Sequence, residues 1–295
     1  MAQSGRPSNN LLIAALVISV LSISSAATLI RIADAPALVV ASARMLIASI
    51  ILWVLAPFLK VSLFRGINWR RALGAGFFLA LHFGFWISSL DSTSVASSLV
   101  LVTMNPIVVA LGSTFLLKDP PGKPLVLGTI ISIIGCIVLV VGEGFDLSGP
   151  LTGNLLALGG AFAMSCYMMI GRTVVSDGNF FGYVTWVNTF SGLFLLIWGV
   201  LTGVQFHSYP GKTMFFILLI ALVPQLVGHS LINWSLKYLH TSYLSAAILV
   251  EPLAGTIIAY LVLGEEFSRF SFYGGVLILF GVGLAFRRSS SVFKG

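Results

Sequence analysis

Two apolar stretches of this chain, 146 residues apart, share one pattern of polar and helix-breaking positions. The earlier stretch covers residues 89–119 and the later one covers residues 235–266. An alignment without gaps pairs Ser89 with Ser235, Leu90 with Leu236, Pro106 with Pro252, Asp119 with Glu265, Gly128 with Gly274 and Gly135 with Gly281. A register that holds over this length indicates that the chain consists of two copies of one unit. The fold must therefore have internal pseudo-symmetry.

Apolar segments occupy most of the chain, and each is about long enough to cross a membrane. The chain is 58% hydrophobic and 8% charged, with a mean hydropathy of +1.04, whereas a soluble domain is about 25% charged. A bilayer core about 30 Å thick requires an apolar helix of about 20 residues. We therefore predict an all-α integral membrane protein with ten transmembrane helices, at residues 11–31, 36–58, 71–90, 95–117, 124–142, 151–171, 181–203, 213–234, 241–263 and 270–286.

Lysine and arginine are distributed unequally between the two sides of the predicted bundle, and cytoplasmic loops are normally the side enriched in them. With the N-terminus inside, the inner segments hold twelve: Arg6, Lys60, Arg65, Arg70, Arg71, Lys118, Lys123, Arg172, Lys237, Arg287, Arg288 and Lys294. The outer loops hold three: Arg31, Lys212 and Arg269. Both termini are therefore predicted to be cytoplasmic, in agreement with an even number of spans.

Each copy contributes five spans, and this odd number places the second copy upside down relative to the first. We predict a first five-helix repeat at 11–142 and a second at 151–286, with a disordered tail at 1–10 and a cytoplasmic tail at 287–295. Inverted repeats recur in secondary transporters, whose substrate sites lie near the bilayer midplane at the repeat interface. A membrane anchor needs no such symmetry, so the duplication favours transport.

The first apolar segment also has features of a secretory signal peptide. It follows Arg6 and ends in the small residues SISSAA, which are typical of a cleavage site. Cleavage would leave nine spans and disrupt the repeat. We therefore retain this segment as the first transmembrane helix.

The chain lacks the sequence signatures of several function classes. The chain has no GxxxxGK[ST] loop, no HExxH, no GxSxG and no paired carboxylates within a span. Its net charge of +7 lies in short loops between apolar runs, which argues against nucleic acid. Cys136 and Cys166 lie in apolar runs without metal-ligand partners and are interpreted as packing residues. We predict no metal, no cofactor and no enzymatic activity.

The paired motifs resemble those of the drug/metabolite transporter superfamily, and specifically its EamA-type members. The second copy reads Val250-Glu251-Pro252 and then Leu263-Gly264-Glu265, and the first reads Met104-Asn105-Pro106 and then Leu117-Lys118-Asp119. The run from Arg44 to Ala48 and the segment Leu236-Lys237-Tyr238 are similar to family patterns as well. The resemblance implies a ten-helix inverted-repeat fold and export of small metabolites.

The chain departs from this family at aromatic positions. A Trp-Gly pair in helix one and a Trp in helix six are replaced by Ile23-Ser24 and Met164. A substrate preference that depends on those indoles therefore does not transfer to this chain.

Glu251 is the most informative candidate site residue, because an ionisable group inside the membrane is costly and is usually functional. It lies about 15 Å along the ninth span at 1.5 Å per residue, and Arg44 lies roughly 12 Å from the outer end of the second. The two side chains are therefore expected at a similar depth. They either form a buried ion pair that fixes helix packing, or face a wet cavity and bind substrate charge or exchange a proton.

Other polar residues within the spans are candidates for the substrate pathway. The histidines are interpreted as packing or proton-handling residues, the tryptophans as an interfacial belt or a cavity wall, and the amides as ligands of substrate or of a neighbouring helix. The tyrosine is included because it matches a family position. The additional pathway candidates are His82, Trp86, Asn105, Tyr167, Gln225, His229, Asn233 and Trp234.

Pro106 and Pro252 have no N–H group, so each leaves the backbone carbonyl one turn earlier without its helical hydrogen bond. Inside a membrane such a carbonyl is tolerated only where it faces protein or a water-filled cavity. The two prolines are interpreted as hinges for alternating access or as packing kinks.

We predict a carrier in the cytoplasmic membrane of a bacterium or archaeon. It exports a small organic metabolite by alternating access, and family analogy favours an amino acid or related compound. The lipid bilayer and the solute are the expected partners, proton coupling and oligomeric state are open, and no nucleic acid is expected. The alternatives are a membrane-embedded enzyme or accessory protein acting on lipids, or a passive channel.

Overall fold

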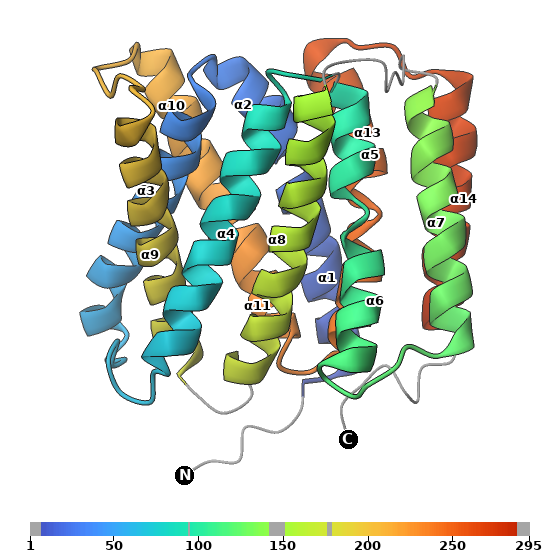
Figure 1. The fold of residues 1–295 in the computed structure, drawn as a ribbon, viewed down its shortest axis with the longest axis horizontal. Helices are drawn as coiled ribbons and strands as arrows, with labels where there is room; N and C mark the ends of the chain where they lie inside the picture. Colours follow the sequence, from blue (N-terminus) through green and yellow to red (C-terminus); the bar gives the residue numbers. More distant parts are fainter. Residues whose placement is uncertain (1–6, 94, 142–150, 176–178, 288–295) are drawn as a thin grey trace.

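The computed structural model describes residues 7–93, 95–141, 151–175 and 179–287. Within these residues it contains ten helical spans that are long and apolar enough to cross a membrane. The spans stand side by side in one bundle (Figure 1). This architecture confirms the predicted all-α membrane fold.

The spans comprise fourteen α-helices and one π-helical segment within the described part of the chain. The first half contains α1 (Asn9–Ser24), α2 (Ala26–Ala33), α3 (Ala37–Phe58), α4 (Trp69–Ser89), α5 (Val95–Val102), α6 (Asn105–Phe115) and α7 (Lys123–Val141). The second half contains α8 (Leu151–Val175), α9 (Phe180–Leu201), α10 (Gly211–Ile220), η1 (Ala221–His229), α11 (Ser230–Ser235), α12 (Thr241–Ile248), α13 (Glu251–Leu263) and α14 (Arg269–Phe286).

The fourth and ninth spans are each interrupted rather than merely kinked. The breaks fall at residues 103–104, between α5 and α6, and at residues 249–250, between α12 and α13. In each case a proline, Pro106 or Pro252, is the second residue of the helix that follows. Proline lacks an N–H group and is tolerated in the first turn of a helix but not in its interior, so each span restarts there. The expected continuous helices at 95–117 and 241–263 are corrected accordingly.

Two further spans are irregular. The first is divided at Ser25 into α1 and α2, and the eighth passes through the π-helical segment η1, which contains Pro224. π-helical turns are rare and occur frequently at functional sites. In this protein, η1 carries Gln225 and His229 to the interior of the bundle.

Helices α7 and α14 pack against each other with their backbones in close contact. Gly128 faces Gly281, and Gly135 faces Gly274, so the two helices run antiparallel. A Cβ atom on Gly135 would lie 2.7 Å from the backbone nitrogen of Ile278. These small residues therefore pack within the bundle itself. The reciprocal pairing supports the inverted arrangement of the two repeats, which stays a prediction.

The glycine contact predicts opposite outcomes for two substitutions on α14. Gly274→Ala is expected to lower the free energy of unfolding by about 1–3 kcal/mol, because the new methyl group would overlap the backbone of Leu139. Gly283→Ala adds the same methyl group where no described atom outside its own stretch of helix lies within 4 Å, so its effect should stay within about 0.5 kcal/mol of wild type. Thermal unfolding in detergent measures both variants. Equal stabilities would contradict the proposed packing.

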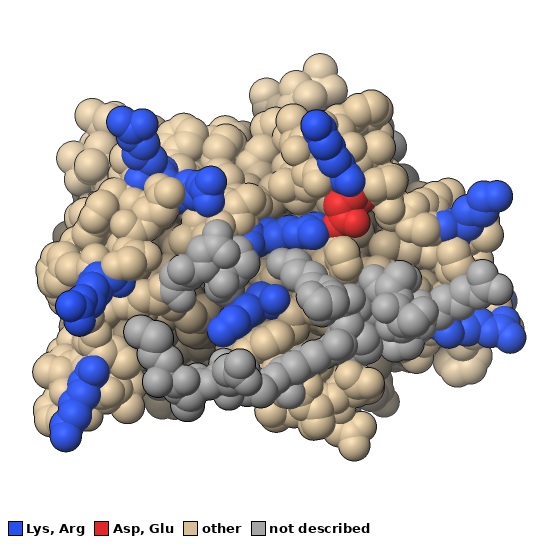
Figure 2. All heavy atoms as spheres, turned by 90° about the horizontal axis from the view of Figure 1, so that it is seen from below, with Lys and Arg blue, Asp and Glu red and all other residues tan. Residues whose placement is uncertain are grey.

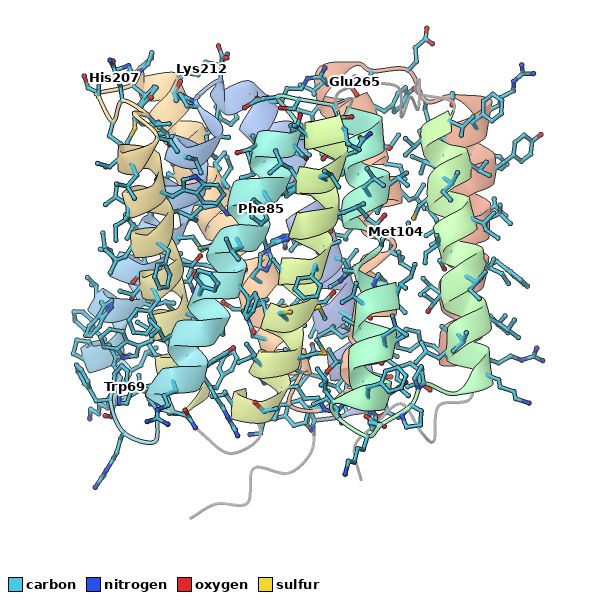
Figure 3. All side chains as sticks on the ribbon, in the orientation of Figure 1. Trp69, Phe85, Met104, His207, Lys212 and Glu265 are labelled. Atoms are coloured by element: carbon cyan, nitrogen blue, oxygen red, sulfur yellow. The ribbon has the colours of Figure 1, made fainter. Side chains whose placement is uncertain are left out.

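The two ends of the bundle differ in charge. Helix α1 begins and α14 ends at the bottom of Figure 1, which we call the inner end. Figure 2 shows this end, with lysine and arginine side chains spread across it and acidic colour at one place only among the described residues. His207, Lys212 and Glu265 lie at the opposite, outer end (Figure 3). This distribution agrees with an inner end in the cytoplasm, which stays a prediction.

Most of both predicted tails, residues 1–6 and 288–295, and the connection at residues 142–150 lie outside the described residues. Helix α1 already begins at Asn9, so the last two residues of the N-terminal segment expected to be disordered are helical.

Candidate functional site

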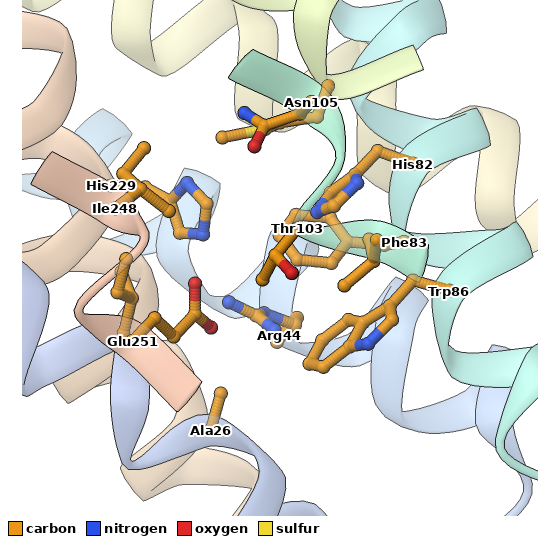
Figure 4. A pocket seen from close by; sticks show the side chains of 13 residues that line it. Ala26, Arg44, His82, Phe83, Trp86, Thr103, Asn105, His229, Ile248 and Glu251 are labelled. Carbon is orange, nitrogen blue, oxygen red and sulfur yellow. The ribbon is translucent and has the colours of Figure 1, made fainter. Parts of the chain in front are cut away.

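A small cavity lies between the two halves of the chain. Its volume is about 40 Å³, room for on the order of three water molecules. Both halves contribute to its wall, and Figure 4 shows their side chains pointing into a common space. The lining residues are Ile23, Ala26, Arg44, His82, Phe83, Trp86, Val102, Thr103, Asn105, Met164, His229, Ile248 and Glu251.

The interruption of the ninth span positions Glu251. This residue is the first of α13, directly after the break at residues 249–250. A carboxylate at a helix N-terminus is stabilised by the free N–H groups and the helix dipole. Asn105 is the first residue of α6 and occupies the equivalent place in the first half. The two breaks thus place a carboxylate and an amide against the same cavity.

Arg44 faces Glu251 across the cavity (Figure 4). The two charges interact electrostatically, but among the described residues no nitrogen–oxygen contact within 4.0 Å joins them as a salt bridge. The predicted proximity is therefore present, whereas a direct ion pair is not formed in this conformation. The charges flank a space that a polar molecule can enter.

Arg44 is held by a chain of hydrogen bonds from the second half. Its Nη2 donates to Gln225 Oε1 at 2.9 Å, and Gln225 Nε2 donates to Asn188 Oδ1 at 2.8 Å. Its guanidinium also lies 4.1 Å from the centre of the Phe83 ring, a favourable cation–π geometry. Nε and Nη1 of Arg44 are buried without a hydrogen-bond partner in the described structure. Two donors therefore remain for a ligand or water.

The histidines and Trp86 complete the polar wall. His82 Nδ1 donates to the Gly160 carbonyl at 3.0 Å, because a carbonyl only accepts, and its ring stacks on Trp86 with centroids 6.1 Å apart. His229 packs edge-on against Phe83 at 5.3 Å. His229 Nδ1 and Trp86 Nε1 are buried without a partner among the described residues. Trp86 is 4% exposed, so its interpretation as an interfacial belt residue is wrong.

Six predicted pathway residues line the cavity, and four do not. The lining residues are Arg44, His82, Trp86, Asn105, His229 and Glu251. Gln225 lies behind Arg44, and Asn233 donates to the Tyr167 hydroxyl at 2.5 Å and to the His229 carbonyl at 2.8 Å. Trp234 packs on Tyr238, with ring centroids 4.9 Å apart. These four residues support the site or lie beside it, and their role in the pathway stays a prediction.

Sequence reasoning did not identify the apolar wall. Phe83, Val102 and Ile248 carry no signal that separates them from other apolar residues of the spans. Ile23 and Met164 could have been identified as wall residues, because they occupy positions where related sequences often have tryptophan. Both line the cavity.

A wider vestibule lies between Glu251 and the outer end. Its volume is about 340 Å³. Glu251 and Pro252 lie at its inner limit, and Arg31, Asp34, Asp91 and Glu265 also line it. Glu251 therefore borders both the vestibule and the cavity.

A separate recess lies at the inner end. It measures about 330 Å³ and shares no lining residue with the cavity. Its wall consists of Asp119, Pro120, Pro121, Gly122, Leu125, His240, Ser242 and Tyr243. In this conformation, the vestibule reaches Glu251 from the outer end, whereas the inner recess does not.

Ten apolar helices that enclose a charged site between two halves define an integral membrane protein of the transporter class. The family model described as the EamA-like transporter family matches the chain twice, over residues 10–141 and 151–287. The chain belongs to this family, as its paired motifs predicted.

Similar proteins agree with this assignment. The chain is 26% identical over 208 residues to the uncharacterized transporter YyaM of Bacillus subtilis, covering 68% of each sequence. It is 25% identical over 203 residues to the uncharacterized transporter YdfC of the same organism, covering 69% of this chain and 65% of that protein. An uncharacterized transporter of Archaeoglobus fulgidus is 26% identical over 218 residues, covering 74% of this chain and 77% of that protein. The match to YdfC thus spans less than two thirds of that relative's length.

One solved crystal structure superposes with a TM-score of 0.79, covering 96% of this chain and all of the other, at 18% identity. This likeness supports the fold. The relatives are named as transporters, which is consistent with the prediction that this chain is not an enzyme.

Proposed function

We propose that this protein exports a small organic solute, an amino acid or related compound, by alternating access around Arg44 and Glu251. The observation that carries the proposal is the pair of opposite charges facing each other across a cavity between the two halves, with a vestibule leading to one end. Ionisable groups buried in a membrane bundle commonly mark a substrate or ion pathway. A packing ion pair would not need the open space between the charges.

The unpartnered donors indicate how such a solute would bind. Arg44 Nε, Arg44 Nη1 and Trp86 Nε1 lack partners in the described structure, and a carboxylate can accept a hydrogen bond from one edge of the guanidinium and another from the indole. A hydrogen bond between a guanidinium and a carboxylate is charge-assisted and roughly twice as strong as one between neutral groups. An ammonium group on the same solute would then lie toward Glu251. The charge pair thus matches a zwitterion without leaving net charge in the membrane.

The volume of the cavity requires movement during transport. About 40 Å³ accommodates a few waters but not an amino acid, so solute entry must separate the cavity walls. The interrupted spans α5–α6 and α12–α13 supply joints at the level of the site, since their breaks directly precede Asn105 and Glu251. Broken helices at the substrate site are a recurring feature of carriers with repeated folds.

Counterflow in proteoliposomes tests the proposed function directly. Purified protein is reconstituted into vesicles loaded with a pooled set of amino acids, and uptake of trace labelled solute is followed against a matched empty-vesicle control. We expect transient, saturable accumulation that disappears when the internal pool is omitted. A flux that rises linearly with concentration and shows no counterflow would indicate a channel. Chemical alteration of the recovered solute would indicate an enzyme.

A further inference from the structure

The inner end of the bundle is closed by a charged cluster that joins the two halves. Asp119 follows α6 of the first half, while Arg172 lies in the last turn of α8 and His240 precedes α12 in the second half. Arg172 Nη1 lies 2.7 Å and His240 Nδ1 2.6 Å from Asp119 Oδ2. Burial alone would raise the pKa of Asp119, but hydrogen bonds from His240 and Arg172 outweigh it and hold that pKa below its ordinary value. The carboxylate is thus ionised at neutral pH.

The outer end has a corresponding charged pair. Arg31 lies in the last turn of α2, in the first half, and its Nη1 contacts the carboxylate of Glu265, which follows α13 in the second half. Both side chains line the mouth of the vestibule. This pair also connects the two halves, at the end opposite to Asp119.

The two clusters are equivalent under the internal repeat. The 146-residue register that relates the halves pairs Asp119 with Glu265. Arg31 and Arg172 each lie in the last turn of the first span of their half. In both clusters, an arginine from the first span of one half therefore contacts the carboxylate that follows the fourth span of the other half. The same contact has been built twice, once at each end.

The clusters differ in burial and in size. The side chains of Arg172 and Asp119 are 16% and 31% exposed, against 62% and 43% for Arg31 and Glu265. Charges that are less exposed are less screened by solvent, and His240 adds a third group at the inner end. The inner contact is therefore the stronger one. The pockets show the same asymmetry, because Glu251 lines the vestibule and does not line the inner recess.

We propose that Asp119–Arg172–His240 and Arg31–Glu265 are the inner and outer gates of the carrier, and that their unequal strength sets which end is open at rest. This inference rests on the proposed alternating access. With the inner gate intact, Glu251 borders the vestibule on the outer side, as in this structure. Loss of the inner contact removes the restraint that keeps the α6–α7 connection against α8 and α12, and favours the conformation open at the inner end.

Thiol labelling tests the gates without requiring a known solute. Reporter cysteines are placed at Ala259, which lines the vestibule, and separately at Ile248, which lines the cavity, in a background carrying Cys136→Ala and Cys166→Ser. A membrane-impermeant methanethiosulfonate reagent is applied to one side of oriented vesicles at a time. Asp119→Asn is expected to slow outer-side labelling of Ala259→Cys and to accelerate inner-side labelling of Ile248→Cys, each by roughly three- to tenfold, the scale expected for losing a partly buried ion pair.

The matched variant at the other end is Glu265→Gln, which removes the same charge from the equivalent position. We expect it to leave outer-side labelling unchanged or faster, and never slower. Asp119→Arg combined with Arg172→Asp restores an ion pair with reversed polarity and should return labelling toward the wild-type rates. Rescue by this double variant separates loss of the gate from general misfolding.

Unchanged labelling in Asp119→Asn, or equal shifts in Asp119→Asn and Glu265→Gln, would overturn the gate proposal. Counterflow of the same preparations distinguishes this failure from failure of the proposed function. Solute counterflow with labelling that does not respond to Asp119→Asn would reject the gates and retain the carrier. The expected labelling shifts without counterflow of any amino acid would retain the gates and reject the proposed substrate.

Discussion

Replacing Glu251 with glutamine is expected to reduce amino-acid counterflow by about 100-fold or more, compared at equal amounts of inserted protein. Glutamine keeps the size and shape of the side chain but removes its charge and replaces one acceptor oxygen with a donor NH2 group. Arg44 would then lack its opposing charge in the cavity. Leaving one member of a buried charge pair uncompensated costs about 3–5 kcal/mol, and a loss of that size in the solute-bound state corresponds to a rate loss of this order.

Glu266→Gln is the matched control for this prediction. Glu266 lies in the exposed loop after α13 and outside the cavity, so the same loss of charge should preserve most of the counterflow. An imposed pH gradient applied to wild type and Glu251→Gln shows in addition whether the carboxylate carries protons. If Glu251→Gln transports at the wild-type rate, the carboxylate is a packing residue and the proposed site is wrong.

The spans were predictable because bilayer thickness imposes a length on any apolar helix, and the sequence meets it ten times. The repeat was visible because pairs such as Pro106 and Pro252 keep their register. The same prolines indicated a disturbance in each helix, but not that the helix restarts at Asn105 or Glu251. Whether a helix restarts depends on whether neighbouring helices supply hydrogen-bond partners for the backbone groups that the break leaves free. The Leu249 carbonyl, for example, accepts from the Cys136 thiol at 3.7 Å.

The wall of the site was only partly predictable. Arg44 and Glu251 were identified by their charge, since ionisable residues inside a membrane are energetically costly, rare and usually functional. Nothing in the sequence distinguishes Phe83, which supports the guanidinium, from other phenylalanines of the spans. The π-helical segment was also missed, because Pro224 within it indicates a disturbed helix but does not specify a π-helical pattern. Gln225 was identified as a buried amide, but its contact with Arg44 emerged only from the structure.

The second large effect is expected at Arg44 and separates a packing role from a transport role. Arg44→Met should lower the free energy of unfolding by about 3–5 kcal/mol, because Glu251 keeps a charge that has lost its partner inside the bundle. Gln225 would also lose the donor to its Oε1 atom. Thermal or denaturant unfolding in detergent measures the loss. Arg71→Met is the control, since Arg71 is exposed and its side chain donates to the Thr173 carbonyl at 3.0 Å rather than to a charged group.

The decisive variant combines Arg44→Met with Glu251→Gln. Removing both charges leaves no unpaired ion in the membrane, so the double variant should regain about 2 kcal/mol or more of the stability lost in Arg44→Met alone. Counterflow should nevertheless stay absent, since neither the carboxylate nor the ammonium of the solute would find its partner. Recovery of stability without recovery of transport assigns the pair to the solute pathway. Recovery of both stability and counterflow would show that the two charges only neutralise each other. The solute would then bind to the uncharged wall of the cavity.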